Sequence, residues 1–198
     1  MVHGGPVPPH VEVRPPRWPA FEAYGSLVAH AGAVGVVMEH GYGAWDQVER
    51  AAADVLAAVE RARRHRTVDP DRVLLWFFSG GGVLAGPWLA DPPEWLAGVA
   101  LTYPVLSHVE DVASDLITPV DAVRERVDVP LLLTRVEHER DWIAPSQTAF
   151  LDAARETGTQ VDVIDVPGAQ HGFETVDDTD AARVAITEGL AWARATLA

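Results

Sequence analysis

The stretch LLWFFSGGGVL, residues 74–84, decides the fold. An apolar run, typical of a strand that is buried on both faces of a sheet, leads directly into Ser79 and three glycines. Apolar residues then resume in a helical pattern, so Ser79 stands where a strand gives way to a helix. A serine on such a tight turn projects its hydroxyl into a cleft, and the small glycines leave room for its strained backbone. The turn therefore predicts a reactive hydroxyl at the carboxyl end of a strand.

The rest of the chain alternates between short apolar runs and longer amphipathic ones. The expected strands cover residues 33–39, 73–78, 98–105, 130–136 and 160–166, and the expected helices cover residues 44–66, 81–90, 146–157 and 180–197. This alternation is typical of an α/β protein, with a mostly parallel sheet and helices on both faces. A chain of 198 residues fits a single domain, residues 1–198, in which we expect residues 106–129 to form a small cap or cover over a cleft.

The composition is that of a folded globular protein, with 48% apolar and 22% charged residues. A formal net charge of −14 repels phosphate backbones and anionic lipid, so we expect neither nucleic acid nor a membrane as a partner. The chain has no cysteine, which excludes thiolate nucleophiles, disulfides and sulfur-based zinc sites. We see no signal peptide and no apolar run as long as a membrane span, and we therefore expect a cytoplasmic protein.

Two further groups complete a catalytic constellation with Ser79. A serine hydroxyl is a weak nucleophile that requires a general base, and the ring of that base requires a carboxylate partner. His171 lies in a glycine-flanked loop after the last expected strand. The expected strand over residues 130–136 is followed by three carboxylates, Glu137, Glu139 and Asp141. Because carboxyl ends of parallel strands share one edge of the sheet, we expect these groups to converge, in the chain order of a hydrolase with a nucleophile elbow.

The chain resembles the α/β-hydrolases, and among them the esterases and dienelactone-hydrolase-like enzymes. The resemblance spans nearly the whole sequence and rests on five motifs, namely HGGP at residues 3–6, DPDR at 69–72, FSGGG at 78–82, YPV at 103–105 and PGAQHGF at 167–173. It implies the α/β-hydrolase fold, a serine–histidine–acid triad, a small-molecule ester or lactone as substrate, and neither a cofactor nor a metal. The oligomeric state stays open, with a homodimer among the alternatives.

The resemblance also assigns roles to further residues. The backbone N–H of Gly80 and one from Gly4 or Gly5 would form the oxyanion hole. Counting along the strand from residue 130 puts the family's acid at Glu139, whereas aligning DWIAP with the family's Asp-x-x-x-Pro pattern favours Asp141. We prefer Glu139 because strand length is the stiffer constraint.

The sequence departs from the family in two places. Phe77 stands where the elbow has its first glycine, so we expect a looser or differently bent turn. In the family, the HGG motif ends a central strand that follows two earlier strands, whereas only Met1 and Val2 precede His3 here. We therefore expect a sheet that is truncated at its N-terminal strands, and a natural protein with residues upstream of Met1.

Two other functions fit parts of the sequence. The pattern Gly80-x-Gly82-x-x-Ala85 after a strand matches a dinucleotide-binding fingerprint. However, the next strand ends in Tyr103-Pro104, where that fingerprint requires an acid for the ribose. The other alternative is a hydrolase-like scaffold without activity, which the elbow phenylalanine and the short start favour.

Overall fold

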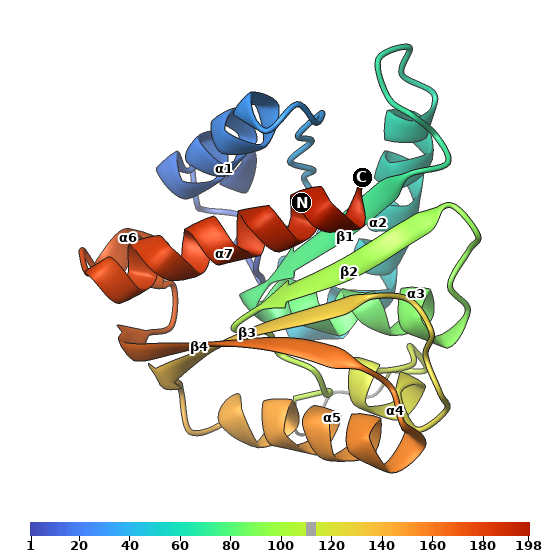
Figure 1. Ribbon diagram of the computed structural model, residues 1–198, viewed down its shortest axis with the longest axis vertical. Coiled ribbons are helices and arrows are strands. Elements are labelled where there is room, and N and C mark those ends of the chain that lie inside the picture. The colour runs from blue at the N-terminus through green and yellow to red at the C-terminus, as the bar shows by residue number, and fades with distance from the viewer. Residues whose placement is uncertain (110–113) are drawn as a thin grey trace.

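The computed structural model of the protein describes residues 1–109 and 114–198, within which four parallel strands form one sheet (Figure 1). The strands are β1 (Val73–Phe78), β2 (Leu96–Thr102), β3 (Leu131–His138) and β4 (Val161–Gln170), and they lie side by side in chain order. The register sets Phe78 opposite Thr102 and Thr102 opposite Thr134. The carboxyl ends of the strands therefore meet at one edge, which is where ligands bind in sheets of this kind.

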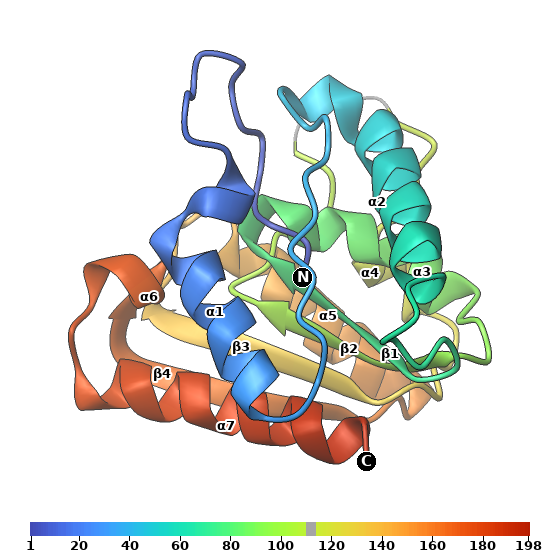
Figure 2. The same ribbon diagram turned by 90° about the horizontal axis from the view of Figure 1, so that it is seen from above.

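Helices cover both faces of the sheet (Figure 2). On one face lie α2 (Val48–Arg63), α3 (Gly86–Ala90), α4 (Pro119–Ala122) and α5 (Ala144–Thr157), and on the other lie α1 (Pro19–His30), α6 (Phe173–Val176) and α7 (Asp180–Thr196). Alternate side chains of a strand point to opposite faces. Leu75 and Phe77 of β1 accordingly belong to the first core, and Trp76 and Phe78 belong to the second. The predicted α/β architecture is confirmed.

The helix ends follow local signals in the sequence. Thr179 caps α7 by accepting a hydrogen bond from the backbone of Ala182, and Gly158 ends α5 in the left-handed conformation with a φ of 76°. Helix α1 was not predicted from the sequence; it begins with a proline at its first position and buries only Phe21 and Tyr24. None of the helices in the described residues is long and apolar enough to cross a membrane.

Residues 33–39 do not form the strand that was predicted for them. Met38 makes a parallel bridge with Val2, and Val2 makes a second parallel bridge with Phe77 of β1. Val34 and Val36 are 50% and 38% exposed, so the segment is not buried on both faces. Residues 33–39 can form a strand only by pairing with a neighbouring strand, and each pair requires a facing residue. Among the described residues Val2 alone faces them, so only one bridge forms. A hollow of about 420 Å³, lined by this segment, β1 and α7, lies beside the open edge of β1.

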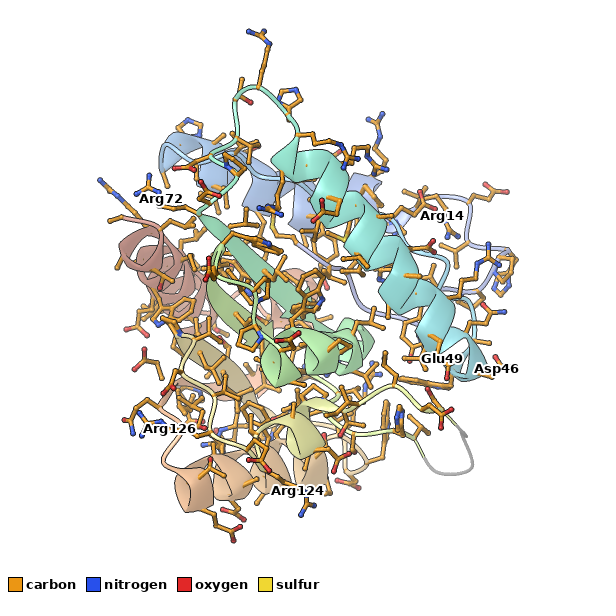
Figure 3. The ribbon with its side chains drawn as sticks, turned by 90° about the vertical axis from the view of Figure 1, so that its right-hand side faces the viewer. Arg14, Asp46, Glu49, Arg72, Arg124 and Arg126 are labelled. Carbon is orange, nitrogen blue, oxygen red and sulfur yellow. The ribbon has the colours of Figure 1, made fainter. Side chains whose placement is uncertain are left out.

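The segment after β2 packs over the helices of the first face. The backbone of Leu106 donates to Ser146 Oγ, and α4 packs against α3. Farther along the segment, Ser114 Oγ and the backbone of Asp115 donate to Glu49 Oε1, at 2.9 Å and 3.1 Å. Glu49 lies in the first turn of α2 (Figure 3). Residues 110–113 of the expected cover, residues 106–129, lie outside the described residues.

Candidate active site

The turn after β1 holds Ser79 in a strained conformation. Its φ is 52°, in the left-handed region that residues other than glycine rarely adopt. The chain continues as a 3₁₀ helix, Ser79–Ala85, and then as α3, in place of the single helix expected over residues 81–90. Phe77 is fully buried in the core, so its bulk is accommodated away from the turn. The elbow therefore keeps its strained serine although its first glycine is replaced.

The glycines of the turn allow a close approach of the N-terminal loop. A Cβ on Gly80 would lie 1.7 Å from the carbonyl oxygen of Gly5, and a Cβ on Gly4 would lie 2.9 Å from Cβ of Ser79. Any side chain at these positions would push the loop and the turn apart. The three glycines expected to form the oxyanion hole, Gly4, Gly5 and Gly80, thus lie together beside Ser79.

His171 lies between Ser79 and a carboxylate. Its Nε2 is 2.6 Å from Ser79 Oγ, and its Nδ1 is 2.7 Å from Oε1 of Glu139. The side chains of His171 and Glu139 are 9% and 4% exposed, so water has little access to their contact. A carboxylate only accepts hydrogen bonds, so Nδ1 carries the proton in this pair and Nε2 is free to accept from the serine hydroxyl.

Three donors fix the carboxylate of Glu139. Gln147 Nε2 donates to Oε2 at 3.1 Å, and the backbone N–H of Arg140 donates to Oε1 at 2.8 Å beside the bond from His171. Gln147 is buried and also donates to the carbonyl oxygen of Pro104. Sequence reasoning missed Gln147. The sequence pattern that could have revealed it is a polar residue on the apolar face of the helix, three positions before Phe150.

The other two carboxylates of the acid cluster face elsewhere. Asp141 is exposed, and Glu137 Oε2 accepts from the backbone of Gly168 at 2.7 Å. Because β3 continues to His138, two residues beyond the expected end, Glu139 is the first residue after the strand. The structure thus brings Glu139, and not Asp141, into contact with the histidine.

Comparison with known proteins gives the fold. No family model and no curated protein matches this chain. Among solved structures, it is similar to a thermophilic esterase from Thermogutta terrifontis, with 20% identity, a TM-score of 0.69, and coverage of 90% of this chain and 74% of that one. The chain has the α/β-hydrolase fold.

Two further solved structures share this fold. Thermogutta terrifontis esterase 2 phosphorylated by paraoxon has 20% identity and a TM-score of 0.68, over 88% of this chain and 73% of that one. A protein assigned as a dienelactone hydrolase, from Klebsiella pneumoniae, has 21% identity and a TM-score of 0.62, over 74% of this chain and 61% of that one. At such identities the likeness concerns the α/β-hydrolase fold alone.

Other parts of the chain occupy the space beside Gly80 and Gly82, the two glycines that match the dinucleotide-binding fingerprint. A Cβ on Gly82 would lie 2.6 Å from Cβ of Pro104, and Gly80 abuts the carbonyl of Gly5. In a dinucleotide site, the glycines of the fingerprint admit a pyrophosphate to the start of the helix. Here the N-terminal loop and the segment after β2 take that space, which argues against the dinucleotide-binding alternative.

A buried histidine pair supports the N-terminal loop. The rings of His3 and His40 stack at a centroid distance of 3.8 Å, and His3 Nδ1 lies 2.6 Å from the carbonyl oxygen of Gly4. His3 Nε2 and His40 Nδ1 are buried, and neither has a hydrogen-bond partner among the described residues. Burial, together with the charge of His40, lowers the pKa of His3 to about 3, and burial also lowers the pKa of His40.

We expect this pair to make the protein sensitive to acid. Because the folded pKa values lie below the ordinary value of about 6.5, the unfolded chain binds more protons, and the free energy of unfolding falls as the pH drops from about 6.5 toward 3. The loss from His3 alone is on the order of 4 kcal/mol. Denaturant unfolding at a series of pH values measures it. His40→Gln removes one of the two titrating rings, so the free energy of unfolding of this variant should depend less steeply on pH in this window. Identical slopes for the variant and the wild type would contradict the expectation.

Proposed function

We propose that this protein is a serine hydrolase that cleaves an ester-type bond, in a carboxylic ester or a lactone, through an acyl-enzyme. The observation that carries the proposal is the continuous path from Ser79 Oγ through the ring of His171 to Glu139, with contacts of 2.6 Å and 2.7 Å. The fold supports it, because esterase 2 of Thermogutta terrifontis shares that fold and is phosphorylated by paraoxon. The proposed site requires no cofactor and no metal.

The chemistry would proceed in two halves. Ser79 Oγ attacks the carbonyl carbon as His171 Nε2 takes its proton, and the oxygen of the carbonyl becomes an anion. Collapse of this intermediate expels the alcohol, which receives the proton from His171 and leaves the acyl group on Ser79. Water then attacks the acyl-enzyme with the same base, and release of the acid restores the serine. Glu139 holds the tautomer of the ring and stabilises its charged form.

Backbone amides would stabilise the oxyanion. We assign this role to the N–H of Gly80 and to one N–H from Gly4 or Gly5, which lie against the serine turn. Loss of one such donor costs about 10² to 10³ in turnover in enzymes of this type. We further assign the cover of the cleft to residues 106–129, and a cytoplasmic location stays a prediction.

Rapid mixing with short-chain nitrophenyl esters tests the proposal. We expect an initial burst of nitrophenol close to one equivalent per chain, followed by slower turnover, because acylation releases the phenol before water frees the enzyme. A lactone supplied under the same conditions should open and release protons. A folded protein that gives neither a burst nor turnover with any of these substrates would favour the silent scaffold and contradict the hydrolase.

A further inference from the structure

Two residues of the described chain other than glycine have a positive φ, and both contact His171. They are Ser79, with a φ of 52°, and Tyr103, with a φ of 35°, and they directly follow the neighbouring strands β1 and β2. Backbone strain of this kind persists only where the surrounding structure enforces it, and it gathers at functional sites. The proposed mechanism explains the strain at Ser79. It leaves the strain at Tyr103 without a role.

The side chain of Tyr103 packs beside the imidazole. The centroid of its ring lies 4.7 Å from that of His171, with the two planes tilted by 57°, and the rings of Tyr103 and Phe173 pack nearly perpendicular to each other at a centroid distance of 5.7 Å. Tyr103 is buried, and its backbone N–H donates to the carbonyl oxygen of Thr134. The phenol ring therefore cannot move away from the histidine without breaking the packing of the strand ends.

A carboxyl group that the mechanism does not use holds the other end of Tyr103. The phenol hydroxyl donates to Oε2 of Glu174 at 2.7 Å, and Tyr24 of α1 donates to Oε1 at 3.0 Å. Glu174 follows His171 by three positions, in α6. Burial raises the pKa of Glu174 and of both phenols, so the phenols remain protonated donors.

The two hydrogen bonds of His171 do not by themselves fix the tilt of its ring. They set the distances at Nε2 and Nδ1, but small rotations about the side-chain torsions of His171 tilt the ring between the serine and Glu139. Such a tilt bends both hydrogen bonds and misdirects the nitrogen lone pair, which weakens proton transfer because transfer depends on alignment as well as distance. A ring packed beside the imidazole restricts this tilt, and Tyr103 lies beside it at a centroid distance of 4.7 Å.

We propose that Tyr103, anchored by Glu174, is a positioning residue that holds the imidazole plane of His171 in line with Ser79. This inference rests on the proposed hydrolase function. It predicts that loss of the phenol hydroxyl lowers kcat and leaves KM nearly unchanged, because the hydroxyl acts on proton transfer and touches no substrate.

Tyr103→Phe and Tyr24→Phe form a matched pair of variants. Each removes one phenol bond to the same carboxyl group and keeps its aromatic ring, but the ring of Tyr24 packs on Trp76 and Phe78 instead of the histidine. We expect a fall in kcat between about tenfold and a hundredfold for Tyr103→Phe, in the range that a small misplacement of a catalytic group costs. For Tyr24→Phe we expect a change of less than about threefold, with a similar fall in melting temperature for both.

Glu174 provides the second test. Glu174→Ala removes the anchor, whereas Glu174→Gln offers an oxygen to one phenol and an N–H to the other, so the glutamine variant should regain most of the kcat that the alanine variant loses. Equal kcat values for Tyr103→Phe and Tyr24→Phe, in folded proteins, would overturn the inference while wild-type turnover upholds the hydrolase. Absence of wild-type turnover would overturn the proposed function, and this inference with it.

Discussion

Ser79→Ala should abolish turnover of a short-chain nitrophenyl ester while the protein stays folded. We expect kcat to fall by at least about 10⁴-fold, because the substitution removes the one oxygen that attacks the carbonyl and leaves only the remaining site to assist water. The fold should survive, since alanine is smaller than serine and occupies the same strained backbone conformation at a similar cost. Initial rates and thermal unfolding of the two proteins measure both effects.

Ser26→Ala provides the control for this comparison. Ser26 is exposed on α1, where its hydroxyl donates to the carbonyl oxygen of Glu22, so it differs from Ser79 in having no contact with the histidine. We expect wild-type turnover from this variant. If Ser79→Ala kept a substantial fraction of the wild-type rate, a different group would have to be the nucleophile, and the assignment would be wrong.

Glu139→Gln should cost nearly as much, about 10⁴-fold in kcat. Both carboxylate oxygens of Glu139 accept from donors, Oε1 from Arg140 N and His171 Nδ1 and Oε2 from Gln147 Nε2. The amide nitrogen of a glutamine would therefore face a donor in either orientation. A glutamine at position 139 would therefore favour the wrong tautomer of His171, in which Nε2 carries the proton and cannot accept a hydrogen bond from the serine.

Asp141→Asn distinguishes the two acids that the sequence left in competition. Asp141 is exposed and lies two positions from Glu139, so this variant changes the same charge on the same loop without reaching the histidine. We expect turnover within about threefold of wild type, as is usual for surface changes away from a catalytic contact. A large loss for Asp141→Asn, with near-normal turnover for Glu139→Gln, would reverse the assignment of the acid.

The sequence predicts a strand best where clear local signals mark both of its ends. The apolar run after the DPDR turn coincides with β1, Val73–Phe78, because turn and serine bound it on both sides. Residues 33–39 are rich in valine, which favours strands, and yet form only a bridge, since pairing depends on the length of the facing segment and not on local propensity alone. β2 ends at Thr102, three residues early, because Tyr103 turns away with a positive φ before Pro104.

The site is predictable to the extent that its residues stand next to strand ends. Ser79, Glu139 and His171 each directly follow a strand, so parallel pairing alone brings them to one edge. No comparable sequence signal identifies the residues that pack around His171. Tyr103 and Glu174 meet only because α6 folds back onto the end of β2, a contact between residues 71 positions apart that no periodic pattern contains.

Labelling with a fluorophosphonate probe, followed by peptide mapping, tests most directly whether Ser79, activated by His171 and Glu139, is the nucleophile. We predict one phosphonyl group per wild-type chain, attached to Ser79, with none on Ser79→Ala and much slower labelling of Glu139→Gln. Folded wild-type protein that takes up no label, or that carries it on another residue, would contradict the hydrolase.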